Sequence, residues 1–220
     1  MSSIIGDIVE LEARSMGLTL STYEIHSFEL YAAELKKWNS KVNLTAITKD
    51  KEIAIKHFVD SLSLAPYIRA GDRLLDIGSG AGLPVIPLKI IRPEIPMVSV
   101  DAVAKKIHFQ RHVIRVLNLQ NIEAIHVRIE ELHKTHRNSF SVITSRAFTR
   151  LDRFVSLAAP LLAENGVLIA MKGDQAEDEI AASDEVVHAG GFTVTSVHRY
   201  TLPQNMGERI LTFIKQSKPL

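Results

Sequence analysis

An α/β fold with a mostly parallel sheet is predicted by three observations on the 220-residue sequence. After residue 70, short apolar runs alternate with amphipathic segments, which is typical of alternating strands and helices. The first apolar run leads into three closely spaced glycines, a pattern found at strand-to-helix turns in such folds. The last two apolar runs have no helical segment between them, so we expect them to form an antiparallel pair within the sheet.

Helices are predicted for residues 1–70, which we expect to form an N-terminal extension. Residues 21–24, Ser-Thr-Tyr-Glu, match a capping box at a helix start. Apolar side chains then recur at helical spacing at Phe28, Tyr31, Leu35 and Trp38. This spacing predicts that Trp38 belongs to the core. Helical spacing returns over residues 53–65 until Pro66 ends it.

Residues 71–220 should form one compact domain that contains the sheet. Its expected strands lie at residues 74–77, 97–100, 122–127, 140–144, 167–171, 192–197 and 209–214. Its expected helices cover residues 85–91, 103–117, 151–162 and 174–189. In open α/β sheets, ligands bind beyond the carboxyl ends of the strands. The turns that follow these strands are therefore the candidate site.

The composition excludes several classes of protein. The sequence has no cysteine, which excludes disulfide scaffolds, Cys-ligated zinc, iron–sulfur clusters and thiol nucleophiles. No apolar run reaches the ~18 uninterrupted residues of a membrane span. The first residues carry acids where a signal peptide would carry basic residues. We therefore expect a cytoplasmic protein that does not contact a membrane.

The net charge of +1 hides a segregation of charge along the chain. Residues 71–150 contain 12 Lys and Arg against 7 Asp and Glu. One acid-free run contains Lys105, Lys106, His108, Arg111, His112 and Arg115. A solvated helix face explains such a run by itself. A second acid-free stretch contains Lys134, His136, Arg137, Arg146 and Arg150, and two basic runs that flank one candidate site carry more weight than either run alone. His108 and His112 have zinc spacing without a third ligand nearby, so we expect no metal site.

The sharpest motif is residues 74–84, Leu-Leu-Asp-Ile-Gly-Ser-Gly-Ala-Gly-Leu-Pro. The predicted strand runs into Gly78, Gly80 and Gly82, and a helix is expected to open at Pro84. Glycines allow a ligand to approach the backbone closely. The N–H groups of the helix start suit a carboxylate or a phosphate. The motif therefore predicts a ligand-binding turn.

Two acids narrow the class of ligand. Asp101 ends the next predicted strand, 19 residues after Gly82, where its carboxylate can accept hydrogen bonds from both ribose hydroxyls. The glycine spacing is Gly-x-Gly-x-Gly after Asp76, and it differs from the Gly-x-Gly-x-x-Gly of dinucleotide sites. This tighter spacing favours S-adenosylmethionine over a nicotinamide coenzyme. The alternative is that the glycine turn only permits a strand and a helix to pack together. The presence of Asp76 and Asp101 argues against this alternative.

The same segment resembles the glycine loop of the bacterial ribosomal RNA small-subunit methyltransferase G family, also called GidB. Further matching segments are residues 38–39, 43–45, 56–62, 126–130, 145–147 and 172–173. The resemblance implies a Rossmann-like class I S-adenosylmethionine-dependent methyltransferase fold. It also implies methylation of N7 of a guanine in a hairpin loop of 16S rRNA.

The resemblance implies roles for individual residues. Gly78 and Leu83 would contact the cofactor, Asp101 its ribose, Ile129 and Glu130 its adenine, and Arg146 the active site beside it. The chain departs from the family pattern at four positions: Leu83, where Phe is usual; Val85, where Gly is usual; Ala102, where Ser or a similar small residue is usual; and Ile129, where Ala is usual. The expected cofactor site therefore consists of Asp76, Gly78, Gly80, Gly82, Leu83, Asp101, Ile129, Glu130 and Arg146.

Arg146 is also the expected catalytic residue, since it follows the strand at residues 140–145 at the ligand-binding edge. An ion pair with an acid at the sheet edge is the alternative. The expected RNA contacts are Lys105, Lys106, Arg111 and Arg146. His57 and Asp60 are three residues apart and can share a helix face. The favoured interpretation is a partly buried His57 that hydrogen-bonds to its neighbouring acid. The alternative is that both residues shape the pocket for the target base beside the cofactor.

Methylation of guanine N7 requires no general base, because this nitrogen carries a lone pair in the neutral base. The protein must instead hold nitrogen, methyl carbon and sulfur in line. The expected partner is 16S rRNA or the small ribosomal subunit, and the expected state is a monomer. A methyltransferase for small molecules and an RNA-binding factor without transferase activity remain the alternatives.

Overall fold

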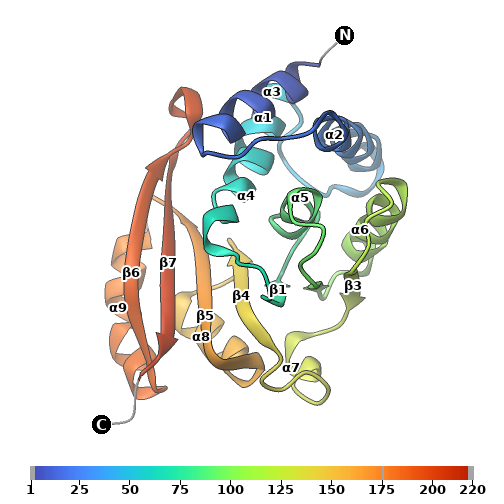
Figure 1. Cartoon of the computed structure of the whole chain (residues 1–220). Helices are drawn as coiled ribbons and strands as arrows, with labels where there is room; N and C mark the ends of the chain where they lie inside the picture. Colours follow the sequence, from blue (N-terminus) through green and yellow to red (C-terminus); the bar gives the residue numbers. More distant parts are fainter. Residues whose placement is uncertain (1–2, 175, 218–220) are drawn as a thin grey trace.

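The computed structural model describes residues 3–174 and 176–217. Its centre is a seven-stranded sheet in the order β3-β2-β1-β4-β5-β7-β6 (Figure 1). The strands are β1 (Leu74–Ile77), β2 (Met97–Asp101), β3 (Ile122–His126), β4 (Phe140–Arg146), β5 (Leu162–Gly173), β6 (Phe192–Thr201) and β7 (Glu208–Gln216). Strands β1 to β5 pair in parallel, and β7 is antiparallel to both β5 and β6. The prediction of a mostly parallel sheet with an antiparallel terminal pair is confirmed.

Helices cover both faces of the sheet. The α-helices are α1 (Ile4–Ser15), α2 (Thr22–Val42), α3 (Asp50–Ile53), α4 (Asp60–Leu62), α5 (Val85–Ile91), α6 (Ala104–Val116), α7 (Ile129–Leu132), α8 (Leu151–Ala158) and α9 (Ala176–Ala189). A π-helical stretch, Ala54–Val59, joins α3 to α4. Short 3₁₀ turns cover Ala65–Tyr67, Ala159–Leu161 and Pro203–Asn205.

The start of α2 follows directly from its sequence. Ser21 accepts a hydrogen bond from the backbone N–H of Glu24, and the Glu24 carboxylate accepts one from the N–H of Ser21, so the predicted capping box is present. The helix ends at Asn43, which adopts a left-handed conformation with φ +48°. The chain then turns into residues 44–49, which lead back towards the sheet.

The helix predicted for residues 151–162 is shorter in the structure. It ends at Ala158 and continues as a 3₁₀ turn, because Pro160 cannot donate the next helical hydrogen bond. Strand β5 then begins at Leu162 and reaches Gly173, longer than the predicted 167–171. A register shift in its pairing with β4 accommodates the first residues of the strand.

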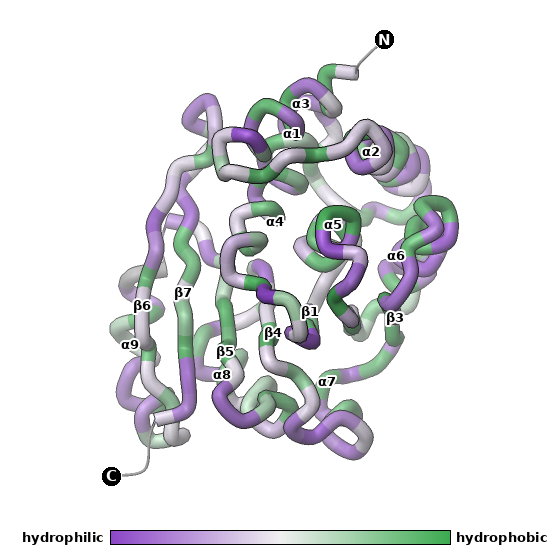
Figure 2. Tube along the Cα trace, viewed as in Figure 1, coloured by the Kyte–Doolittle hydropathy of each residue, from purple (hydrophilic) through white to green (hydrophobic). Residues whose placement is uncertain are grey.

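The core consists of two layers, one on each face of the sheet. One layer packs helices α1 to α6 on the sheet and contains Phe28, Tyr31 and Phe58. The other packs α7, α8 and α9 on the opposite face. Apolar segments of the tube lie along the strands and the facing helices (Figure 2). The N-terminal helices therefore share one core with the sheet, and they carry the 44–49 segment to its ligand-binding edge.

Trp38 belongs to the first core layer, as its spacing predicts. Its ring lies 5.6 Å from Phe109 of α6, between ring centroids, and 5.1 Å from His112. Within the described part of the chain, no helix is long and apolar enough to cross a membrane.

Candidate active site

The glycine turn after β1 is tied to the end of β2. The N–H groups of Gly78 and Ser79 donate to the carbonyl of Val100 at 2.9 and 3.2 Å. Gly78 and Gly80 have φ angles of +70° and +60°, which an L-residue adopts only with strain. No atom lies within 4 Å of the position that a Cβ of Gly80 would take. The turn therefore presents open space at Gly80, where the sequence predicts a ligand.

A buried polar network holds the underside of this turn. The Gln110 amide nitrogen donates to the Gly80 carbonyl and to the Ser79 hydroxyl, each at 2.8 Å. Ser99 of β2 donates to the Gln110 amide oxygen. All three side chains are buried. Gln110 is not among the site residues predicted from the sequence, where its signal is a polar residue among the apolar positions of the helix at residues 104–116.

Asp101 at the end of β2 supports the turn from the other side. One carboxylate oxygen accepts a hydrogen bond from the Gly80 N–H at 3.0 Å, and the other accepts one from the Val103 N–H at 2.8 Å. The Lys106 ammonium lies 3.4 Å from the carboxylate oxygen that accepts the Gly80 hydrogen bond. Each carboxylate oxygen has a second lone pair, so the side chain can still accept a hydrogen bond from a ligand.

Two cavities meet at this turn. A cavity of about 420 Å³ is lined by Gly78, Asp101, Ile129, Glu130 and Phe148, among others. A cavity of about 500 Å³ is lined by Gly78, Gly80, Leu83, Asp60, Arg146, Lys172 and Arg209, among others. Gly78, Lys106 and Ala147 line both. A ligand with two ends can therefore occupy both cavities across Gly78.

Phe148 lines the smaller cavity and packs against Gly78, which lines both cavities. A Cβ on Gly78 would lie 2.3 Å from a carbon of the Phe148 ring. The ring is 37% exposed, and the preceding Ala147 has a positive φ of +50°. Only glycine at position 78 allows this close contact.

Two of the predicted cofactor residues lie outside the walls of both cavities. Asp76 is fully buried in β1, where no described side chain donates a hydrogen bond to its carboxylate and the backbone N–H of Val85 at the start of α5 faces it. Burial raises the pKa of Asp76 well above its usual range. A Cβ on Gly82 would lie 2.4 Å from Ile86 and 3.3 Å from the Tyr31 hydroxyl. Gly82 therefore allows helix packing, and a direct cofactor contact of either residue stays a prediction.

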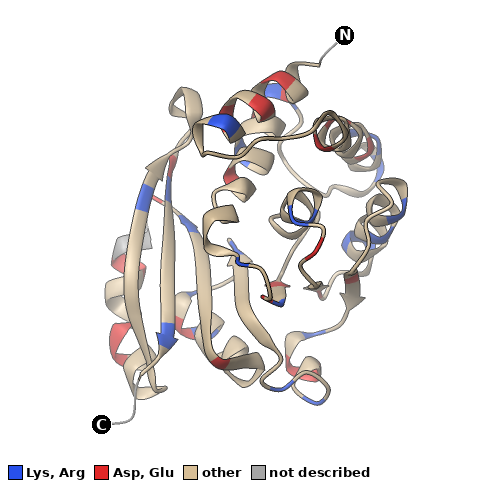
Figure 3. Cartoon of the chain, viewed as in Figure 1, with Lys and Arg blue, Asp and Glu red and all other residues tan. Residues whose placement is uncertain are grey.

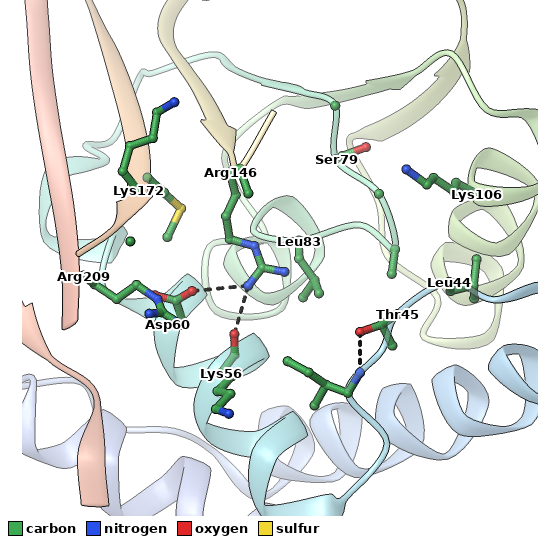
Figure 4. A pocket seen from close by; sticks show the side chains of 17 residues that line it. Leu44, Thr45, Lys56, Asp60, Ser79, Leu83, Lys106, Arg146, Lys172 and Arg209 are labelled. Atoms are coloured by element: carbon green, nitrogen blue, oxygen red, sulfur yellow. Dashed lines mark hydrogen bonds and ion pairs between the residues drawn. The ribbon is translucent and has the colours of Figure 1, made fainter. Parts of the chain in front are cut away.

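Arg146 is the last residue of β4 and enters the larger cavity (Figure 4). One guanidinium nitrogen donates to the Lys56 carbonyl at 3.0 Å and to the Asp60 carboxylate at 3.3 Å. The other terminal nitrogen lies 3.5 Å from Nδ1 of His57. The acid that pairs with Arg146 therefore comes from the N-terminal helices and is not an acid at the sheet edge.

His57 and Asp60 do not satisfy each other, contrary to the interpretation favoured from the sequence. The ring of His57 lies 2.9 Å from the Thr45 hydroxyl, between Nε2 and Oγ1, and its other nitrogen faces Arg146. The Arg146 guanidinium lies where it can contact both side chains, so each has a partner other than its neighbour. Burial, and secondly the Arg146 charge, lowers the pKa of His57 to about 4, so its ring is neutral at pH 7.

Asp60 binds further partners from the C-terminal strands. Its second oxygen accepts a hydrogen bond from the Tyr200 hydroxyl at 2.8 Å and lies 3.4 Å from Nε of Arg209. The Tyr200 hydroxyl is also 2.9 Å from the Ser63 hydroxyl. Tyr200 and Arg209 were missed in the sequence, where the only signal is their position in the terminal antiparallel pair.

The walls of the larger cavity carry an excess of positive charge. Its cationic lining residues are Lys56, Lys106, Arg146, Lys172 and Arg209, and its acidic lining residue is Asp60. The Lys172 ammonium donates to the Thr149 carbonyl and lies 2.8 Å from the Glu179 carboxylate of α9. Lys56 and Lys106 likewise lie 3.0 and 3.4 Å from the carboxylates of Glu52 and Asp101, so five cations face four acids and a net charge of +1 remains for an anionic ligand.

The three residues of α6 that were predicted to contact RNA lie in different environments in the structure. Lys106 lines both cavities, while Lys105 and Arg111 are exposed on the helix. Arg111 donates from Nε to the Ala124 carbonyl at 2.9 Å, which holds it against β3. Basic residues lie along helix α6, which packs beside β3 at the edge of the sheet (Figure 3).

A metal site finds no support among the described side chains, where no group of three or more His, Cys, Asp or Glu residues could hold an ion. His112 lies 2.6 Å from the Glu34 carboxylate of α2, and His108 is exposed. His112 therefore pairs with an acid of α2 while His108 faces solvent, so the two histidines do not form a zinc site together.

The chain matches a family model and several curated proteins. The model described as GidB, rRNA small subunit methyltransferase G, matches residues 24–206. A Ribosomal RNA small subunit methyltransferase G of Geobacter sp. (strain M21) is 47% identical over 208 residues, covering 94% of this chain and 96% of that protein. A protein of the same name from Desulfitobacterium hafniense (strain Y51) is 38% identical over 209 residues, covering 94% and 87%.

Solved structures with little sequence similarity share the fold. A SAM-dependent methyltransferase from Aquifex aeolicus superposes with a TM-score of 0.58 and 13% identity, covering 83% of this chain and 97% of that one. TYW2 from M. jannaschii, solved in complex with AdoMet, superposes with a TM-score of 0.57 and 11% identity, covering 71% of this chain and 74% of that one. The family model and the curated relatives agree with the glycine turn and its two cavities. The chain is therefore an S-adenosylmethionine-dependent methyltransferase that belongs to the rRNA small subunit methyltransferase G family.

Proposed function

We propose that this protein transfers the methyl group of S-adenosylmethionine to N7 of a guanine in 16S rRNA. The observation that carries the proposal is the pair of cavities that meet at Gly78, the larger of which is lined by five cations and one acid. A cofactor and a polyanionic substrate can thus approach one point from two sides. The relatives that match over most of the chain are named as methyltransferases of small-subunit rRNA.

The residues around Gly78 fit the cofactor. The carboxylate of Asp101 can accept a hydrogen bond from a ribose hydroxyl, and Ile129 and Glu130 line the same cavity, where an adenine would lie. The open space at Gly80 admits the amino-acid end, whose carboxylate Arg146 can bind. When bound, the cofactor supplies a methyl group activated by a sulfonium charge.

The chain's own residues provide positioning. The N7 lone pair of neutral guanine attacks carbon directly, so no side chain has to remove a proton. Placing the base in line with the methyl group can supply ~7–11 kcal/mol of the barrier. Arg146, the predicted catalytic residue, is fixed by Lys56 and Asp60 beside the glycine turn, where it can hold the cofactor or the base.

Charge placement matters in this reaction, because the positive charge moves from sulfur to the purine ring. The neutral state of His57 adds no cation to the wall beside Arg146. The phosphates of RNA would balance the excess positive charge of the cavity and of Lys105, Lys106 and Arg111.

The test is transfer of labelled methyl groups from S-adenosylmethionine to ribosomal RNA isolated from cells that lack the protein. Nuclease digestion and mass spectrometry should find 7-methylguanosine in 16S rRNA, and Arg146→Ala should abolish its formation. Turnover of metabolites without labelling of RNA would identify a small-molecule enzyme. RNA binding without any transfer would identify a non-catalytic factor, and either result contradicts the proposal.

A further inference from the structure

We infer that Asp60 is a positioning residue for RNA, which holds the guanidinium groups of Arg146 and Arg209 in the wall of the larger cavity as a site for a backbone phosphate of the target nucleotide. The inference rests on the proposed function and deepens it. It assigns a role to a buried acid that has no proton to accept in the reaction.

Asp60 brings together side chains from segments far apart in the sequence. One carboxylate oxygen contacts Arg146 of β4 at 3.3 Å, and the other contacts Arg209 of β7 at 3.4 Å and the Tyr200 hydroxyl of β6 at 2.8 Å. The Asp60 side chain is 3% exposed. It is therefore too buried to meet a polymeric substrate and acts through its partners.

The two arginines remain accessible where Asp60 does not. Their side chains are 20% and 24% exposed, and both line the larger cavity. In the close view, Arg209 lies on the side of Arg146 that faces away from Leu83 and the glycine turn (Figure 4). The arginine pair thus extends the cavity beyond the cofactor end.

Each guanidinium has donors left for a ligand. Arg146 spends Nη1 on Lys56 and Asp60 and one N–H of Nη2 on His57, while Arg209 spends Nε on Asp60 and Nη1 on the Glu208 carbonyl. In the part of the chain that the structure describes, no hydrogen bond uses Nε of Arg146 or Nη2 of Arg209. Planar guanidinium groups bind phosphate oxygens with two parallel hydrogen bonds. The pair therefore suits a phosphodiester.

Asp60 makes this pair possible by its charge. Two guanidinium groups against one small volume repel each other, and a carboxylate between them offsets that repulsion. Two cations and one anion leave a net charge of +1, which still attracts a phosphate. Without the carboxylate, we expect the arginines to move apart and the phosphate site to be lost.

The test is Asp60→Asn, which preserves size and removes the charge. We expect the KM for RNA to rise about tenfold, the effect of losing one charge-assisted hydrogen bond, while kcat changes less. The matched control is Asp50→Asn, which breaks the exposed ion pair of Asp50 with Lys36 and should leave both constants unchanged. A fall in kcat and in melting temperature with an unchanged KM would show a merely structural residue and overturn the inference.

A double-mutant cycle tests whether Asp60 acts through Arg209. Arg209→Gln should raise the KM for RNA, and adding Asp60→Asn should then raise it by a clearly smaller factor than in the wild type. Equal factors in both backgrounds would overturn the inference. Arg209→Lys keeps the charge but loses the planar fork, so it should raise KM without lowering the melting temperature, and it serves if Asp60→Asn does not fold. Failure of the proposed function is distinct, since the wild type itself would then methylate no guanine.

Discussion

The carboxylate of Asp101 accepts a hydrogen bond from the backbone N–H of Gly80 at 3.0 Å, which joins the end of β2 to the glycine turn after β1. The acid that the sequence places beside a ribose therefore has a second task in the free protein. It fixes the backbone that faces the ligand before the ligand arrives. Loss of this side chain should affect both cofactor binding and the stability of the turn.

Replacing Asp101 by alanine should lower the affinity for S-adenosylmethionine by at least about tenfold, because hydrogen bonds to a charged acceptor contribute ~1.5–3 kcal/mol each. The N–H groups of Gly80 and Val103 also lose their acceptor. We expect the melting temperature to fall by a few degrees as a result. Titration calorimetry and thermal unfolding measure the two effects, and an unchanged affinity would contradict the ribose role.

Alanine at two glycines of the turn should produce opposite effects. At Gly82, φ is +90° and a Cβ would lie 2.4 Å from Ile86, so Gly82→Ala should cost ~2–4 kcal/mol of unfolding free energy. At Gly80, φ is +60° and the Cβ meets no atom, so Gly80→Ala should cost only ~1 kcal/mol. Its methyl group would instead enter the larger cavity and weaken cofactor binding. Urea unfolding and calorimetry on both variants separate the two effects, and equal destabilisation would contradict this assignment.

Removing the charges of Lys105 and Lys106 together should weaken RNA binding at low salt. The logarithm of the binding constant should also fall less steeply with the logarithm of salt, by about 1 to 2 in slope, because two phosphate contacts are lost. Filter binding over a range of salt concentrations measures this slope. A double alanine variant at Lys36 and Lys37 of α2 is the matched control. A slope identical to that of the wild type would remove Lys105 and Lys106 from the RNA interface.

Local patterns in the sequence sufficed for the existence and order of the strands and for the glycine turn, while β5 and β6 extend several residues beyond their apolar runs. Strand β1 and helix α5 have the predicted bounds, because apolar runs and glycines determine them within a few residues. Asp101 was found for the same reason, since it ends the strand after the motif. The end of α8 was not predicted, because Pro160 converts the last turn to 3₁₀ geometry while the apolar pattern continues.

The wall of the larger cavity depends on contacts that no local pattern contains. Asp60, Arg146, Tyr200 and Arg209 come from a helix and three strands, and sheet order alone brings β4, β6 and β7 near the same helix. A sequence shows which of these residues carry charge but not which charges meet. The pairing of His57 was wrong for this reason, since its partners lie at Thr45 and Arg146 and not at the neighbouring acid.

The neutral state of His57 predicts how stability depends on pH. Burial, and secondly the Arg146 charge, lowers the pKa of His57 to about 4 in the folded protein, against about 6.5 in the unfolded chain. Between these values, a falling pH protonates this imidazole in the unfolded chain only, so the free energy of unfolding decreases. Above pH 6.5 the ring is neutral in both states and contributes no slope. At pH 5 the loss attributable to His57 should be roughly 2 kcal/mol.

Urea unfolding of the wild type and of His57→Gln, each at pH 7 and pH 5, isolates this contribution, since the other titrating groups are common to both proteins. The difference between the two pH values should be about 2 kcal/mol smaller in the variant. The control is Ser40→Ala, which removes an exposed, non-titrating hydroxyl from α2 and should keep the pH dependence of the wild type. If His57→Gln also keeps it, the ring is charged in the folded protein. Arg146 would then face a cation, and the wall of the larger cavity would need another source of compensating charge.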